Sequence, residues 1–207
     1  MVRVTGKEAG KRVRMSPGER RHQLITLGTR MLRERALEDI SIGEIAAQAG
    51  ISRGLLFHYF SSKQDFQLAI VANANAELLA RTTPDRTLGL GAMLRDAVRR
   101  YVDYVSENRT SYLALLRRPA GAELMALADA TRAALATRIL AELPLPQDDP
   151  VRPRLALVAR GWIAFVEEVT LSWLSAETIT REQLVDTLVE SLPGLAADPA
   201  LTAALRE

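Results

Sequence analysis

The chain has 207 residues, 48% of them hydrophobic, with 27 basic and 25 acidic side chains and a formal net charge of +2. It has no cysteine and only two histidines, which excludes disulfides, thiolate zinc sites and histidine-rich metal sites, so we expect no cofactor and no metal. No apolar stretch approaches the ~20 residues that cross a bilayer, and the first fifteen residues lack the apolar core of a signal peptide, which favours a globular cytoplasmic protein without a membrane partner.

Composition and spacing predict an all-α fold. Alanine, leucine, arginine and glutamate dominate the chain, and these are strong helix formers. Apolar residues recur at spacings of three and four along most of the sequence, and no sustained alternation typical of a strand occurs.

Residues 1–15 predict a flexible basic arm. They hold five basic side chains, one acidic side chain and few large apolar groups, which is too little apolar surface to order the segment. The arm is either a solvated tail or a segment that lies along a polyanion.

Serine residues mark the starts of the next four predicted helices. Ser16 and Glu19 have the Ser-x-x-Glu spacing of a capping box, with a proline between them at the first helical position. The same spacing recurs at Ser41 and Glu44, where a short second helix opens. Two further caps, Ser52 and Ser62, begin a third helix that runs to about residue 59 and a fourth that follows directly.

The remainder predicts longer helices separated by breaks. Four of the nine prolines fall between residues 144 and 153, which indicates a loop. The predicted helices span 83–107, 111–117, 122–143, 154–175 and 180 to about 194.

The stretch 41–60, SIGEIAAQAGISRGLLFHYF, has the physical requirements of a helix-turn-helix. Small residues in the first helix allow close approach of a second helix, and Gly50 permits the positive φ of a tight turn. Ser52 caps the second helix and leaves its first turn free to meet base edges in a major groove.

Residues 20–70 closely resemble the DNA-binding domain of TetR-type transcriptional regulators. The IAxxAGISxG core and the aromatic cluster before a lysine carry the resemblance. It implies a homodimer that binds an operator in double-stranded DNA. The positions that it assigns to DNA contact are Ser41, Ile42, Gly43, Ser52, Arg53, Gly54, Leu55, Phe57, His58, Tyr59 and Lys63.

Three of these positions have alternative interpretations, and a fourth departs from the family. His58 either faces the DNA or is a surface or satisfied core residue. Arg53 either reads a guanine, worth about 1–3 kcal/mol of discrimination, or contacts only phosphate. Leu55 either touches a thymine methyl or packs. Phe57 replaces the tyrosine that is frequent in the family and has no hydroxyl to donate to a phosphate.

Two further positions concern the DNA backbone. Lys63 opens the fourth helix, where its ammonium group and the helix N-terminus can share a phosphate. Gly43 has no side chain and offers at most a backbone N–H.

Charge is divided unevenly along the chain. Residues 1–63 hold 12 basic and 6 acidic side chains, whereas residues 64–207 hold 15 basic and 19 acidic ones. A polyanion is therefore attracted to the first part of the chain and not to the second.

For the second part, the resemblance implies a ligand pocket and a four-helix bundle with a second subunit, formed by the last two long helices. Arg160 and Glu167 share a face of the first of these helices and either line a cavity, pair across an interface or face solvent. Size and spacing give a candidate pocket lining of Met93, Tyr101, Tyr104, Tyr112, Met125, Trp162 and Phe165.

The sequence thus predicts three segments: a basic arm (1–15), a helix-turn-helix domain (16–62) and a helical regulatory and dimerisation domain (63–207). The function that fits best is a homodimeric repressor that a small molecule releases from its operator. Nucleotide-binding and hydrolase motifs are absent, and the single Glu19-x-x-His22 is only half of a di-iron motif, so we expect no enzymatic activity. The alternative is a helical ligand-binding or interaction module without a DNA function.

Overall fold

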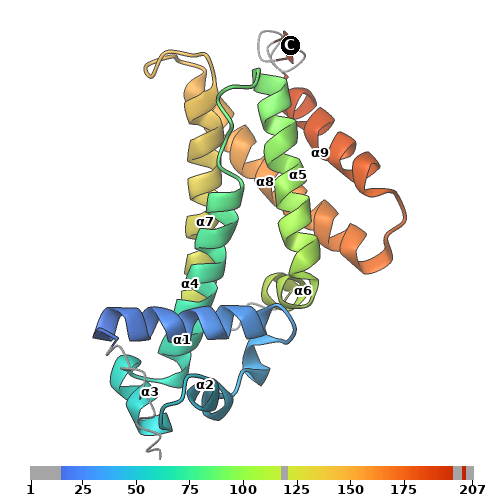
Figure 1. Cartoon of the computed structure of the whole chain (residues 1–207). Coiled ribbons are helices and arrows are strands. Elements are labelled where there is room, and N and C mark those ends of the chain that lie inside the picture. Colours follow the sequence, from blue (N-terminus) through green and yellow to red (C-terminus); the bar gives the residue numbers. More distant parts are fainter. Residues whose placement is uncertain (1–14, 118–120, 198–201, 204–207) are drawn as a thin grey trace, which may run out of the picture.

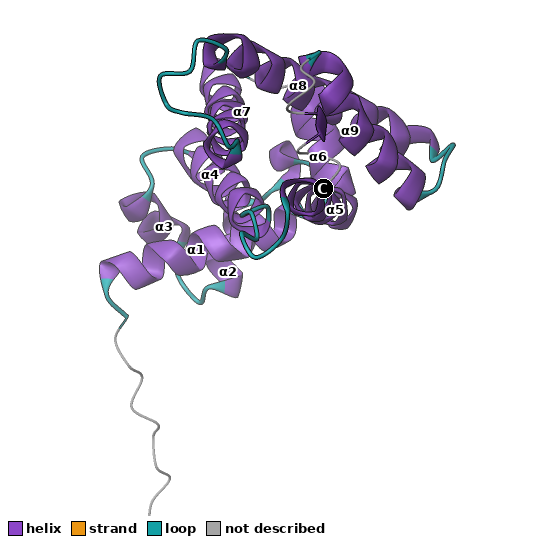
Figure 2. Cartoon of the chain, turned by 90° about the horizontal axis from the view of Figure 1, so that it is seen from above, coloured by secondary structure: helices purple, strands orange, loops and turns teal. Residues whose placement is uncertain are grey.

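The computed structural model describes residues 15–117, 121–197 and 202–203. All regular structure in this part of the chain is helical, which confirms the all-α prediction. A small group of short helices forms one end of the molecule, and longer helices extend from it (Figures 1 and 2). The elements are α1 (Pro17–Leu32), η1 (Leu37–Asp39), α2 (Ile42–Gln48), α3 (Arg53–Tyr59), α4 (Lys63–Arg81), α5 (Leu90–Glu107), α6 (Arg109–Arg117), α7 (Ala122–Glu142), α8 (Arg152–Ala176) and α9 (Arg181–Ala196).

The predicted helix caps are largely confirmed. Ser16 and Glu19 form a reciprocal capping box at α1, with distances of 3.2 Å and 2.7 Å, and Ser62 accepts a hydrogen bond at the start of α4. At α2 the expected side-chain cap is absent. Ser41 makes no cap hydrogen bond there, and Glu44 instead accepts two hydrogen bonds from Arg35, at 2.7 and 3.1 Å.

One predicted helix boundary is wrong by seven residues, and others differ by about two. The helix expected from residue 83 begins only at Leu90, because the Asp85 carboxylate accepts hydrogen bonds from the backbone and hydroxyl of Thr87 and closes a turn. The last helix runs about two residues past the expected end near residue 194, to Ala196, where Ala197 in the left-handed conformation (φ 48°) closes it. The predicted basic arm lies outside the described residues, except for Met15.

The N-terminal core joins α1 to α3 with the first half of α4. Phe60 and Phe66 are almost fully buried and meet edge to face, with ring centroids 4.8 Å apart. Gly28 lets α1 approach α4 closely, since a Cβ there would lie 2.6 Å from Cγ1 of Ile70. These contacts fix α4 against the short helices.

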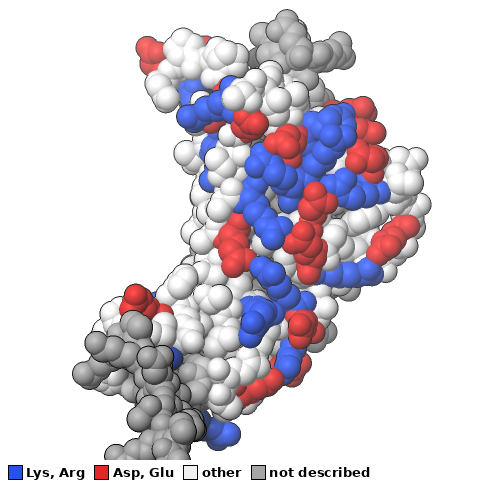
Figure 3. Space-filling model, viewed as in Figure 1, with Lys and Arg blue, Asp and Glu red and all other residues white. Residues whose placement is uncertain are grey.

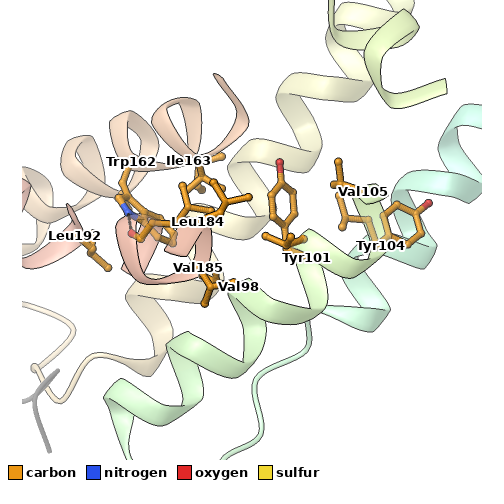
Figure 4. Packing of buried hydrophobic residues seen from close by; sticks show 14 of the residues in the cluster. Val98, Tyr101, Tyr104, Val105, Trp162, Ile163, Leu184, Val185 and Leu192 are labelled. Atoms are coloured by element: carbon orange, nitrogen blue, oxygen red, sulfur yellow. Dashed lines mark hydrogen bonds between the residues drawn. The ribbon is translucent and has the colours of Figure 1, made fainter. Parts of the chain in front are cut away.

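The second half of α4 belongs to the C-terminal core. Leu78 packs there with residues of α5, α8 and α9, and Figure 4 shows Val98 and Trp162 in the same cluster. Because Phe66 and Leu78 lie in different cores, α4 connects the two parts of the molecule.

Ion pairs link the exposed surfaces of α5 and α9. Arg95 binds Asp186, Arg99 binds Glu182 at 3.0 Å, and Arg181 binds Asp103. Positively and negatively charged side chains alternate on the face of the molecule that Figure 3 shows. Each exposed pair contributes at most about 1 kcal/mol. No helix in the described residues is long and apolar enough to span a membrane.

Candidate DNA interface and ligand cavity

The turn between α2 and α3 places α3 at the surface. Gly50 has a φ of +66°, as the turn requires, and the Ile51 N–H donates to the Ala46 carbonyl at 2.9 Å. The Ser52 hydroxyl then accepts from the Leu55 N–H at 3.1 Å, which confirms the predicted cap. Leu56 is completely buried, so it holds one side of α3 against the core and leaves the other side free.

The outer side of α3 carries large apolar groups. Leu55 is 41% exposed and Phe57 is 46% exposed, while the neighbouring His58 is also at the surface. Tyr59 is half-buried and packs against the N-terminal core. Apolar side chains on a major-groove helix suit contact with thymine methyl groups.

The Arg53 guanidinium lies against the start of α2. A Cβ at Gly43 would stand 2.8 Å from Nε and 2.9 Å from Cζ of Arg53, and closer still to Nη2. No side chain fits there unless Arg53 moves. Gly43 therefore provides the space that the guanidinium occupies, a role beyond the backbone N–H that its sequence position predicts.

A groove of about 410 Å³ lies where η1 and the starts of α2, α3 and α4 converge. The Lys63 ammonium group donates to the Glu38 carbonyl across it, at 3.0 Å. Glu38 and Asp39 also line the groove, and sequence reasoning missed them because no motif marks η1. Six predicted DNA-contact residues meet in the groove: Ser41, Ile42, Gly43, Arg53, Phe57 and Lys63.

A second cavity lies among the longer helices. It has a volume of about 120 Å³ and is lined mainly by apolar side chains of α4, α5, α7 and α8. The few polar side chains at its wall include Tyr101, Arg138 and Glu167. A mostly apolar cavity with a few polar groups is typical of small-molecule sites.

Polar groups gather around Tyr101 at the wall of this cavity. The hydroxyls of Tyr101 and Tyr112 lie 2.6 Å apart, and burial raises the pKa of both groups above the usual tyrosine value. Glu167 accepts a hydrogen bond from Arg132 at 2.7 Å. Burial raises the pKa of Glu167, whereas Arg132 opposes that shift.

Comparison with known proteins agrees with this arrangement in both parts of the chain. Residues 24–70 match the model of bacterial regulatory proteins of the tetR family, and residues 90–194 match the Tetracyclin repressor-like C-terminal domain. The chain belongs to the TetR family. It is therefore a DNA-binding transcriptional regulator with a helix-turn-helix domain.

Individual relatives resemble this TetR-family chain over different lengths. A tetR-family transcriptional regulator from Streptomyces coelicolor is 35% identical, with a TM-score of 0.79 over 93% of this chain and 89% of that one. An uncharacterised HTH-type transcriptional regulator of Mycobacterium tuberculosis is 27% identical over 89% of this chain and 81% of its own length. The nucleoid occlusion factor SlmA of Pasteurella multocida is 39% identical, but the match spans only 35% of this chain and 37% of that protein.

The candidate pocket residues of this TetR-family chain fall into three groups. Met93, Tyr101 and Trp162 line the cavity, and Tyr112 lies behind Tyr101. Tyr104 points away from Trp162 (Figure 4), and its hydroxyl donates to the Ala74 carbonyl at 2.8 Å.

The two remaining candidates also lie off the wall. Phe165 packs on the C-terminal core, and Met125 is 48% exposed near the start of α7. Arg160, whose role the sequence left open, is exposed, whereas Glu167 lines the cavity. Aromatic size alone does not distinguish a cavity wall from a packed core.

Proposed function

We propose that this chain is a homodimeric repressor that leaves its operator when a small molecule fills the cavity among α4, α5, α7 and α8. The observation that carries the proposal is that α4 contributes both to the core beneath α3 and to the cavity wall. A ligand that alters the position of α4 therefore acts on the recognition helix. The shift in DNA affinity is limited to the difference in ligand affinity between the two conformations.

The outer face of α8 supports dimerisation. Leu157 is 73% exposed, and Gly161 and Ala164 follow at helical spacing on the same exposed face. A Cβ at Gly161 would meet nothing within 4 Å, so the surface there is open to a second helix. Leu195 of α9 is also 51% exposed, and together α8 and α9 offer half of a four-helix bundle. Two recognition helices in such a dimer reach successive major grooves when they lie about 34–36 Å apart.

Arg53 and Lys63 have different roles in this proposal. Arg53 stands at the first position of α3 and reads a base, whereas Lys63 stands at the first position of α4 and binds phosphate. Arg53→Ala should relax sequence preference, and Lys63→Ala should weaken binding to all duplexes alike. Equal loss of specificity in both variants would contradict these assignments.

The rival function is a helical ligand-binding module that does not act on DNA. A gel shift with the DNA upstream of its own gene, beside thermal stabilisation by small molecules, separates the two functions. Stabilisation without any shift of that DNA would favour the rival. A ligand that strengthens the DNA complex would instead indicate an activator or a corepressed regulator.

A further inference from the structure

Two tyrosine hydroxyl groups meet beside the cavity. Tyr101 lines the cavity, and the hydroxyl of Tyr112 lies 2.6 Å from the hydroxyl of Tyr101. The hydroxyl of Thr170 on α8 is also buried near Tyr101 and has no hydrogen-bond partner among the described residues. Two hydroxyls that share one hydrogen bond use one of their two hydrogens, so one tyrosine O–H is left to donate. A buried donor without an acceptor is unfavourable, so this part of the cavity favours a ligand that supplies an acceptor.

The charged groups around the cavity are already paired or bonded. Both oxygens of Glu142 accept hydrogen bonds from Arg86, at 2.7–3.2 Å. The Arg138 guanidinium donates to the Leu79 carbonyl at 2.6 Å. At the Tyr101 end, Arg132 binds both Glu167 and Asp129.

These six side chains comprise three carboxylates and three guanidinium groups, so their charges cancel. An ionised ligand would lose its hydration and leave this neutral set of side chains with a net charge, which is unfavourable in mostly apolar surroundings. The charge balance therefore favours an uncharged ligand.

The dimensions limit the size of the ligand. The lining residues of α7 run from Thr131 to Glu142, which at helical rise is about 16 Å. The volume of about 120 Å³ is close to that of an apolar protein cavity of about 150 Å³ that accepts benzene. A chain of roughly seven carbons fits a cavity of this length and volume.

We infer that the effector is an uncharged, narrow, mainly apolar molecule with a carbonyl-type oxygen, which accepts a hydrogen bond from the hydroxyl cluster at Tyr101. This inference rests on the proposed function only in calling the ligand an effector. The ligand class itself follows from the cavity.

Four probes of the same shape test the ligand class: 2-heptanone, 2-methylheptane, hexanoate and protonated 2-aminoheptane. Each has eight non-hydrogen atoms, and only the polar end differs. Binding to the full-length Trp173→Phe protein is followed through the fluorescence of Trp162, which lines the cavity, and through thermal stabilisation without DNA. The ketone should bind about 2- to 10-fold more tightly than the hydrocarbon, and both should bind more tightly than either ion.

A tyrosine variant locates the hydrogen bond. Tyr101→Phe should abolish the preference for the ketone over the hydrocarbon and leave hydrocarbon affinity nearly unchanged. Tyr104→Phe is the matched control, because that hydroxyl donates to Ala74 instead of lining the cavity. An ion that binds more tightly than the ketone, equal affinity for ketone and hydrocarbon, or no binding of any probe would overturn the inference. Ketone binding that leaves DNA affinity unchanged would support the ligand class and refute ligand-released repression.

Discussion

Replacing Gly43 with alanine inserts a methyl group where the Arg53 guanidinium lies. The new Cβ would stand less than 3 Å from three guanidinium atoms, so the side chain must leave the start of α2. Arg53 is exposed and flexible at that end, and alanine is favoured over glycine in a helix by up to about 1 kcal/mol. The stability of the fold should therefore be unchanged or slightly raised, while the placement of Arg53 on DNA is lost.

The expected effect on DNA binding follows from the value of one base contact. A bidentate arginine–guanine contact contributes about 1–3 kcal/mol, so Gly43→Ala should weaken operator binding by about 5- to 150-fold and random-sequence binding much less. Fluorescence anisotropy with labelled duplexes measures both affinities, and thermal unfolding checks the fold.

Gly18→Ala is the matched control for this substitution. Gly18 is also the second residue of its helix, and a Cβ there would meet nothing within 4 Å. The double variant with Arg53→Ala isolates the cause, because Gly43→Ala should have no further effect once the guanidinium is gone. Operator affinity that is unaffected by Gly43→Ala, or an effect that persists in the Arg53→Ala background, would refute the reasoning.

Three other predictions concern packing, assembly and pH. Gly28→Ala should lower the free energy of unfolding by about 1–3 kcal/mol in denaturant titrations, because the added methyl group overlaps Ile70. An unchanged free energy of unfolding would show that α1 and α4 adjust freely. Leu157→Arg should give a monomer in light scattering and weaken operator binding by about 100-fold or more. The control Leu88→Arg, at an exposed position in the loop before α5, should stay dimeric. A dimeric Leu157→Arg protein would place the interface elsewhere. Burial raises the pKa of Tyr104 to about 12, so the folded state retains a proton that the unfolded state loses between pH 10 and about 12. The free energy of unfolding should therefore fall as pH rises through that window. Tyr104→Phe should make this fall less steep, and an unchanged slope would contradict the assignment.

Local sequence signals predict the parts of this fold that depend on neighbouring residues. The capping box at Ser16, the turn at Gly50 and the cap at Ser52 each involve groups within a few residues, so spacing is sufficient. Thr83-Pro84 resembles a helix start and predicts helix in the loop before α5, whereas the Asp85 side chain closes a turn there.

The polar groups of the cavity and the position of Arg53 depend on long-range contacts. Arg132 and Glu167 are 35 residues apart, and no local pattern relates them. Gly43 has no side chain from which to infer a role, and only the fold shows that Arg53 occupies the space beside it. Tyr101 and Tyr104 lie on one helix with similar spacing from other apolar residues, yet only Tyr101 reaches the cavity.

The most direct test of a DNA-binding regulator is a salt series with two duplexes. The affinity of the full-length protein is measured for the DNA upstream of its own gene and for a random duplex of equal length, between about 50 and 200 mM salt. We predict that the upstream DNA binds about 1,000-fold or more tightly at physiological salt, and that both affinities fall steeply as salt rises. Equal affinity for the two duplexes at every salt concentration would contradict sequence-specific regulation from this site.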